Sequence, residues 1–488
     1  MMEWNVIWDW LSYDPQKPLL FNSEAFLYLF LGFFFIYILL KDVCRLRILY
    51  VIAFSLFFYY KCSGIYFILL ILSSFVDFYI SDLIYKSQKT VTRKWLLVLS
   101  CVINLGVLAY FKYTGFLTEN FNALFSGDLS FDTIFLPIGI SFYTFQTMSY
   151  TIDIYRRELE PARNVWDFMF FVSFFPQLVA GPIVRAKDFI PQIYEKLHLT
   201  KKELSYAFYL IIGGLIKKAV ISDYISVNFV DRVFNFPDNY TAFENLLAVY
   251  GYTLQIYCDF SGYSDIAIGL ALLLGFQLPP NFRTPYQSTS VTEFWRRWHI
   301  SLSGWLRDYL YISMGGNRKG KLRTYFNLFM TMLLGGLWHG ASWKFVLWGA
   351  MHGSVLAIEK AFRIPKLTNK DVALKLMAGI LTFHFVAFCW IFFRASDFAN
   401  ALNVIDNIGM LEWSPQNWWS VIAGYQNVAI VMLIGFLWHF IPQNWQDQQL
   451  LSFHRIPVVG KVVLFAVTIW IISATASSEV QPFIYFQF

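Results

Sequence analysis

Four histidines lie inside or beside strongly apolar stretches of this 488-residue chain, where an ionisable side chain is costly and therefore points to a function. His339 differs from the others because its run, Leu334–Gly340, contains three glycines that would let another backbone or a substrate approach closely. An imidazole that is neutral near pH 7 suits a general base. A histidine that only bridges two helices explains His339 equally well, and it is the favoured interpretation for His352, His384 and His439.

A basic segment at residues 281–323 carries eight basic and two acidic side chains, and its net charge of +6 equals that of the whole chain. By the positive-inside rule it faces the cytoplasm. Ser290 and Glu293 have capping-box spacing, and apolar residues then recur at helical spacing, which predicts one interfacial helix from Ser290 to the Gly315–Asn317 turn. The charges either set the topology or bind phosphates of a substrate. The phosphate-binding candidates are Arg296, Arg297, Arg307, Arg318, Lys319 and Lys321.

Two carboxylates and one amide are further candidates to line a buried polar site. Asp259 and Asp265 flank Gly262 within otherwise apolar sequence, and Gln146 lies in another apolar run. A solvated bend between two half-helices explains the aspartates at least as well as a site does. Metal binding is not predicted, because the histidines lack HxxxH spacing and no cysteine pair lies near them.

The elements that carry these residues must be membrane helices. Hydrophobic residues make up 57% of the chain and charged residues 14%, whereas about 25% charged is usual in soluble domains. The runs are too long for barrel strands. We therefore predict an all-α integral membrane protein with about 11–14 hydrophobic helices, without a disulfide framework or a nucleic-acid partner. The runs lie near Ala25–Leu40, Ile48–Tyr60, Ile65–Leu83, Trp95–Phe111, Ile134–Ile154, Phe168–Ile183, Tyr206–Ile221, Phe243–Tyr257, Ile266–Phe276, Tyr325–Trp338, Trp343–Ile358, Leu374–Phe393, Val428–Phe440 and Val462–Ile472.

Charges between the runs predict the orientation of the chain. Basic side chains follow the first and third runs and acidic ones the fourth, which places the N-terminus outside the cytoplasm. Later runs break this alternation, so at least one should be re-entrant, and helix breakers occur at Pro137–Gly139, Pro176–Pro182 and Asp259–Asp265. We expect one polytopic domain, 1–488, with N-terminal helices at 1–133, a catalytic core at 134–362 and C-terminal helices at 363–488.

Seven motifs between about residues 134 and 350 resemble signature stretches of the membrane-bound O-acyltransferases, specifically of the alginate O-acetyltransferase branch. They are Leu136–Phe142, Asp259–Asp265, Pro280–Tyr286, Glu293–Leu302, Trp305–Tyr311, Gly315–Arg318 and Leu334–Gly340.

The resemblance implies a ring of transmembrane helices around a core of tilted and re-entrant helices, with a funnel leading to one hallmark histidine. His339 matches that residue, and His299 matches a second histidine nearer the thioester entrance. Trp338 and Gly336, beside the hallmark histidine, are then expected to contact substrate.

The resemblance also implies an activity. We expect a multi-pass protein of the bacterial inner membrane that moves acetyl from acetyl-CoA through the bilayer for O-acetylation of a cell-surface polysaccharide, with no bound cofactor. Its partners would be acetyl-CoA, membrane lipid, the polysaccharide and an extracytoplasmic acetyltransferase. Three alternatives stay open: D-alanyl transfer from a carrier protein to a cell-wall polymer, direct acylation of a lipid or protein, and a non-enzymatic glycan or ion transporter. The lack of inverted repeats counts against the transporter.

Overall fold

The computed structural model describes residues 11–15, 17–130, 134–179, 181–362, 371–475, 481, 483 and 484. Within these residues the regular structure is entirely helical, which confirms the predicted all-α class. The chain forms two compact units. One contains Met1–Ala207 and Ala267–Pro279, and the other contains Phe208–Ile266 and Pro280–Ile484. Two helices pass from one unit to the other, α11 (Lys201–Leu215) and α14 (Ala242–Leu273).

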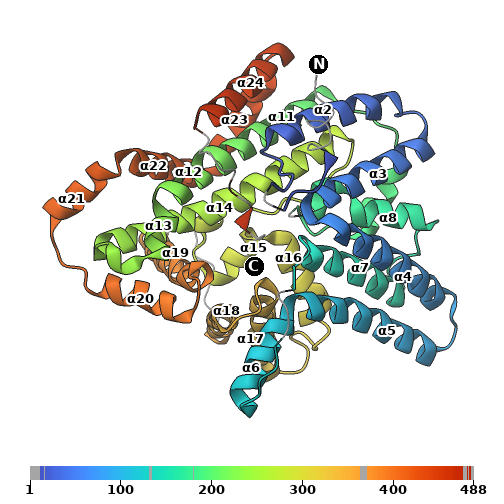
Figure 1. Cartoon of the computed structure of the whole chain (residues 1–488), viewed down its shortest axis with the longest axis horizontal. Coiled ribbons are helices and arrows are strands. Elements are labelled where there is room, and N and C mark those ends of the chain that lie inside the picture. Colours follow the sequence, from blue (N-terminus) through green and yellow to red (C-terminus); the bar gives the residue numbers. More distant parts are fainter. Residues whose placement is uncertain are drawn as a thin grey trace. The chain divides into compact units, whose positions relative to one another are not determined.

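The first unit is built mainly from long apolar helices. In Figure 1, α4, α5 and α7 run side by side, and all three pairs of these helices are in contact. The helices of this unit are α2 (Glu24–Leu39), α3 (Cys44–Ser63), α4 (Phe67–Lys86), α5 (Thr90–Leu108), α6 (Thr114–Phe125), α7 (Ile140–Tyr155), α8 (Val165–Ser173), α9 (Phe175–Leu178) and α10 (Ala186–Phe189), with short turns η1 (Gly64–Tyr66), η2 (Ala109–Tyr113) and η3 (Ile190–Tyr194).

A buried polar network joins α4, α5 and α7. Asp77 on α4 is fully buried, and its carboxylate accepts hydrogen bonds from Ser100 Oγ at 2.6 Å and from Asn104 Nδ2 at 2.9 Å, both on α5. Asn104 Oδ1 in turn accepts from Thr147 on α7 at 3.0 Å. Because apolar surfaces alone give membrane helices little preference for one another, such hydrogen bonds help to specify which helices pair.

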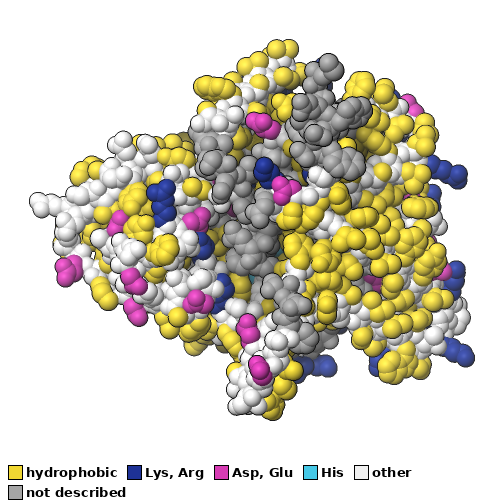
Figure 2. All heavy atoms as spheres, viewed as in Figure 1, with side chains coloured by type: hydrophobic (Ala, Val, Ile, Leu, Met, Phe, Trp, Pro, Cys, Tyr) yellow, Lys and Arg dark blue, Asp and Glu magenta, His cyan; other side chains and the backbone are white. Residues whose placement is uncertain are grey.

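The outer face of α4 and α5 is hydrophobic. Figure 2 shows apolar side chains covering this face, with lysine and arginine at its edge. Leu72 is 54% exposed, Trp95 67% and Val102 62%. Large apolar side chains exposed in such number fit contact with lipid. Within the part of the chain that the structure describes, five helical segments are long and apolar enough to cross a membrane, or up to seven if each of two bent helix pairs counts as one span.

The second unit contains the candidate catalytic residues. Its helices α17 and α18 pack against each other as a hairpin. The helices are α12 (Asp223–Ile225), α13 (Asp231–Asn235), α15 (Val291–Arg297), α16 (Ile300–Trp305), α17 (Lys321–His339), α18 (Trp343–Ala361), α19 (Val372–Arg394), α20 (Phe398–Gly409), α21 (Pro415–Gly424), α22 (Gln426–Phe440), α23 (Gln443–Arg455) and α24 (Val458–Thr475), with turns η4 (Ile216–Ser222), η5 (Ser226–Val230), η6 (Pro237–Asn239), η7 (Pro285–Gln287) and η8 (Leu306–Tyr311).

Two of the three predicted helix breaks are present. Gly139, with a φ of +78°, ends the turn before α7, and the chain around Pro176 forms only the four-residue α9. The predicted bend at Asp259–Asp265 is wrong, because α14 is continuous across it. Gly262 lies instead where α14 crosses α11, and a Cβ atom there would come within 2.7 Å of Gly214 O. The glycine therefore serves close helix packing rather than a bend.

Candidate active site

His339 is the last residue of α17 and is only 4% exposed. Its ring lies among aromatic side chains, with centroid distances of 5.0 Å to Trp338, 5.1 Å to Trp348 on α18 and 5.4 Å to Phe393 on α19. All three rings meet the imidazole edge to face, at interplanar angles of 71° to 85°. The histidine therefore occupies a largely apolar environment in which an added charge would be poorly solvated.

The glycines around His339 bring α17 and α18 into close contact. A Cβ atom at Gly336 would lie 2.2 Å from Phe345 O, and one at Gly349 would lie 2.4 Å from Met332 O. At Gly340 a Cβ atom would lie 2.1 Å from the Phe345 ring. The glycine run was expected to allow close approach of another backbone or of a substrate, and it is α18 that lies beside Gly336 and Gly340.

His299 lies in a sharp break between α15 and α16. Its φ of +43° falls in the left-handed region, and the residue is fully buried. Asn281 stabilises this break with its side chain and its backbone. Its Oδ1 lies 3.1 Å from His299 Nδ1 and accepts from Ser301 Oγ at 2.9 Å. Its carbonyl oxygen accepts from Ile300 N at 2.9 Å. Burial lowers the pKa of His299 to about 3, so the ring is neutral at pH 7.

This break corrects the prediction of one interfacial helix. The cap at Ser290 is confirmed, because its side chain accepts from Glu293 N at 3.1 Å, and the Gly315 and Gly316 turn with positive φ also follows as expected. Between them, however, the chain forms α15, α16 and η8. Its apolar side chains pack inside the unit rather than against lipid, since Phe294, Trp298 and Leu302 are each 1% exposed.

The structure brings three of the predicted site residues together. Trp338 lies between the two histidines, with its ring centroid 5.0 Å from His339 and 6.4 Å from His299. Gln146 is buried on α7 and belongs to the first unit.

Three of the basic candidates lie at the start of α17, and we call these three the basic cluster. Arg318, Lys319 and Lys321 are exposed at the glycine turn that precedes this helix. Arg296 is also exposed, Arg297 is paired with Glu293 at 2.6 Å, and Arg307 is paired with Asp308 at 2.6 Å. Because α17 begins in the basic cluster and ends at His339, one helix links the two predicted parts of the site.

Both predicted aspartates are ion-paired with lysines. Asp265 contacts Lys217 at 2.5 Å, and Asp259 contacts Lys218 at 2.6 Å. Lys218 also contacts Asp223 at 2.7 Å. The second oxygen of Asp259 accepts from Ile484 N at 3.0 Å, and this bond joins the backbone at Ile484 to α14. These partners account for the burial of Asp259, which is 3% exposed.

The remaining apolar histidines make helix-bridging contacts. His352 Nδ1 accepts from Trp295 Nε1 at 3.3 Å, and His439 Nε2 accepts from Tyr286 N at 3.1 Å. His384 contacts the Tyr250 hydroxyl at 3.0 Å. These contacts agree with the structural interpretation favoured for the three residues.

Sequence reasoning missed the residues that hold the site in place. Asn281, Trp348 and Phe393 position the two histidines but come from separate parts of the chain. Asn281 carried a weak signal, because it is a polar residue directly after Pro279 and Pro280. The aromatic residues carried none, since the chain contains 52 phenylalanines and 18 tryptophans.

The chain is similar to a known protein family and to several bacterial proteins. Residues 162–395 match the MBOAT, membrane-bound O-acyltransferase family, and include both His299 and His339. A probable alginate O-acetylase AlgI of Azotobacter vinelandii is 41% identical over 386 residues, which cover 78% of this chain and 76% of that protein. The peptidoglycan O-acetyltransferase of Helicobacter pylori is 34% identical over 418 residues, 79% of each chain. The teichoic acid D-alanyltransferase of Bacillus subtilis is 30% identical over 279 residues, 54% of this chain and 69% of that protein.

Proposed function

The chain belongs to the membrane-bound O-acyltransferase family, and we propose that it takes acetyl from cytoplasmic acetyl-CoA and passes it across the membrane for O-acetylation of a cell-surface polysaccharide. The names of the alginate and peptidoglycan relatives support acetyl as the group and a polysaccharide as the acceptor. The observation that carries the proposal is α17, which begins in the exposed basic cluster and ends at the buried His339. Its 19 residues rise about 28 Å from the basic cluster to the histidine.

In this proposal His339 is the general base. Its neutral imidazole takes the proton of the accepting hydroxyl while that oxygen attacks the thioester carbonyl, and the carbon–sulfur bond then breaks to release the coenzyme thiolate. The imidazolium returns its proton to the thiolate, so the histidine ends as it began. A positioned base of this kind contributes about 10²-fold to 10⁴-fold in rate. His299, neutral and held by Asn281, faces Trp338 and keeps that indole beside His339.

Replacing the proposed base tests its role directly. We expect His339→Ala to abolish acetylation of the surface polysaccharide while the protein remains folded and inserted, and His384→Ala to leave it unchanged. His384 is the matched control because it is an exposed histidine on α19. The measurement is the ester-linked acetyl content of surface polysaccharide from cells making equal amounts of each protein. Normal acetylation in His339→Ala would refute the mechanism.

The donor is tested with purified protein. We expect it to bind acetyl-CoA and, with water in place of the accepting hydroxyl, to hydrolyse it slowly without any carrier protein. Activity only with a D-alanyl carrier protein would instead favour the alternative that the teichoic acid relative represents. We also propose that acetyl transfer in cells requires an extracytoplasmic acetyltransferase as partner. The chain itself would lie in the bacterial inner membrane with its N-terminus outside the cytoplasm.

A further inference from the structure

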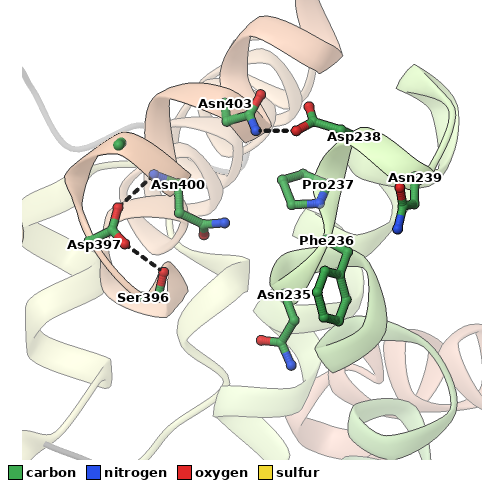
Figure 3. Close-up of a pocket in the computed structure, with 10 residues that line it drawn as sticks. Asn235, Phe236, Pro237, Asp238, Asn239, Ser396, Asp397, Asn400 and Asn403 are labelled. Carbon is green, nitrogen blue, oxygen red and sulfur yellow. Dashed lines mark hydrogen bonds between the residues drawn. The ribbon is translucent and has the colours of Figure 1, made fainter.

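A polar pocket lies in the second unit, away from the histidines in the sequence. Its volume is about 560 Å³, within the range of about 300–1,000 Å³ that is usual for small-ligand sites. Figure 3 shows two walls facing each other, one formed by residues 235–239 around η6 and the other by the start of α20. The lining residues are Asn235, Phe236, Pro237, Asp238, Asn239, Ser396, Asp397, Ala399, Asn400 and Asn403.

The two walls are fixed to each other by side-chain hydrogen bonds. Asp238 accepts from Asn403 Nδ2 at 2.9 Å and from Asn407 Nδ2 at 3.2 Å, and Asn400 Nδ2 donates to Phe234 O at 3.0 Å. Asp397 caps α20 by accepting from Asn400 N at 2.8 Å. The pocket is therefore formed by tied elements rather than by a loose gap between loops.

The pocket offers the groups that sugars require. A sugar hydroxyl donates and accepts at once, and four asparagines with two carboxylates supply both kinds of partner. Phe236 is 63% exposed and lines the pocket, so its ring is accessible to a ligand there. The electron-rich face of an aromatic ring attracts the weakly positive C–H face of a pyranose.

The charges in the pocket favour a neutral ligand. None of the ten lining residues is basic, and two are aspartates. Hydrogen bonds from Asn403 and Asn407 lower the pKa of Asp238, and the backbone bond from Asn400 lowers that of Asp397, so both are ionised at neutral pH. Arg394 pairs with Asp231 at 2.5 Å, and Lys344 donates to Ala395 O while its charge also helps to lower the pKa of Asp397, so neither side chain lines the pocket. A polyuronate would be repelled here.

The chain order puts the pocket at the face opposite the basic segment. Its first wall directly precedes α14, and residues 281–323 follow the other end of that helix. The second wall follows the end of α19, another helix long enough to span a membrane. With the basic segment in the cytoplasm, both walls lie at the extracytoplasmic surface.

We propose that this pocket binds uncharged sugar residues of the acceptor polysaccharide and holds the chain near the outer exit of the acyl-transfer path. The proposal rests on the proposed function and specifies the acceptor class. Phe236 stacks on one sugar face, while Asp238, Asp397 and the asparagines bind its hydroxyls. The site is a binding site and takes no part in the chemistry.

Binding of oligosaccharides to the full-length protein in nanodiscs tests the proposal. The probes are cellotetraose, which is neutral, and tetramannuronate, which is anionic, measured by saturation-transfer NMR and titration. We expect cellotetraose alone to bind, and Phe236→Ala to weaken it by about fivefold to tenfold. Phe362→Ala is the matched control, since this phenylalanine is 78% exposed at the far end of α18.

A second variant tests the charge preference. Asn239 is exposed at the pocket, and Asn239→Lys halves the negative charge of the lining, so it should weaken the discrimination against tetramannuronate without making that probe the preferred one. His339→Ala should bind cellotetraose as the wild type does, so a failure of the catalytic proposal would leave this readout unchanged. No cellotetraose binding, stronger binding of tetramannuronate by the wild type, or equal weakening by Phe362→Ala would each overturn the assignment.

Discussion

His299 combines an unfavourable backbone conformation with complete burial. A φ of +43° is uncommon for residues other than glycine, although histidine, asparagine and aspartate adopt positive φ more often than the rest. Asn281 compensates by bonding the imidazole, the next backbone amide and the Ser301 side chain. The strain is thus stored beside Trp338 and the proposed base, as is common at functional sites.

The buried ring should make stability depend on pH. The pKa of His299 is about 3 in the folded protein, whereas an unfolded histidine titrates near 6.5. The unfolded chain therefore binds a proton that the folded chain does not, and stability falls as the pH drops from 6.5 toward 3. We expect His299→Asn, which tolerates the positive φ, to lose about 2 kcal/mol less between pH 7 and pH 5 than the wild type does.

The measurement is thermal unfolding in detergent at each pH. The other histidines are common to both proteins and cancel in the difference. An identical pH dependence in the two proteins would mean that folded His299 takes up a proton.

At the scale of elements, the α17–α18 hairpin depends on glycines at positions where the two helices are too close for any side chain. We expect Gly336→Ala to destabilise the protein by about 1–3 kcal/mol or more, because its methyl group meets the backbone at Phe345 O rather than a flexible side chain. Gly213→Ala on α11 is the control, since nothing lies within 4 Å of a Cβ atom there and alanine favours the helix. Tryptophan-detected thermal unfolding should show opposite signs for the two variants. Equal effects would mean that the hairpin can separate without cost.

The start of α17 carries a separate prediction about the donor. Replacing Arg318, Lys319 and Lys321 together by glutamine should raise the KM for acetyl-CoA more than it lowers kcat, because the three exposed charges contact phosphates and not the reacting atoms. Glutamine replacements at Lys86, Lys89 and Lys94, which lie in the first unit, form the control. An unchanged KM would leave the basic cluster with a topological role alone.

Local signals predicted helix ends well and tertiary partners poorly. The Ser290 cap and the Gly315 turn depend on neighbouring residues, so spacing was enough to find them. Gly262 was misinterpreted because the same residue suits a bend and a close helix crossing, and only the position of α11 decides between them. The lysine partners of Asp259 and Asp265 lie more than 40 positions earlier in the sequence, beyond the reach of any local pattern.

At the scale of the whole molecule, the proposed topology requires the pocket and the basic cluster to lie on opposite sides of the membrane. A cysteine at Asn239 should react with a membrane-impermeant maleimide in intact spheroplasts, whereas one at Lys319 should react only after permeabilisation. Both positions are exposed in the structure, so access depends on the membrane alone. The parent protein with its five native cysteines gives the background. Labelling of Lys319→Cys in intact spheroplasts would invert the proposed topology.

The Asp77 network bears on how the protein is made. At about 5–20 residues per second, ribosomes reach Asn104 a few seconds after Asp77, and Thr147 several seconds later still. During that interval the carboxylate on α4 has no completed set of partners in the lipid. Chains truncated before α7 should therefore be recognised by membrane proteases and degraded, while full-length chains persist. Quality control during synthesis would then act through one aspartate that takes no part in acetyl transfer.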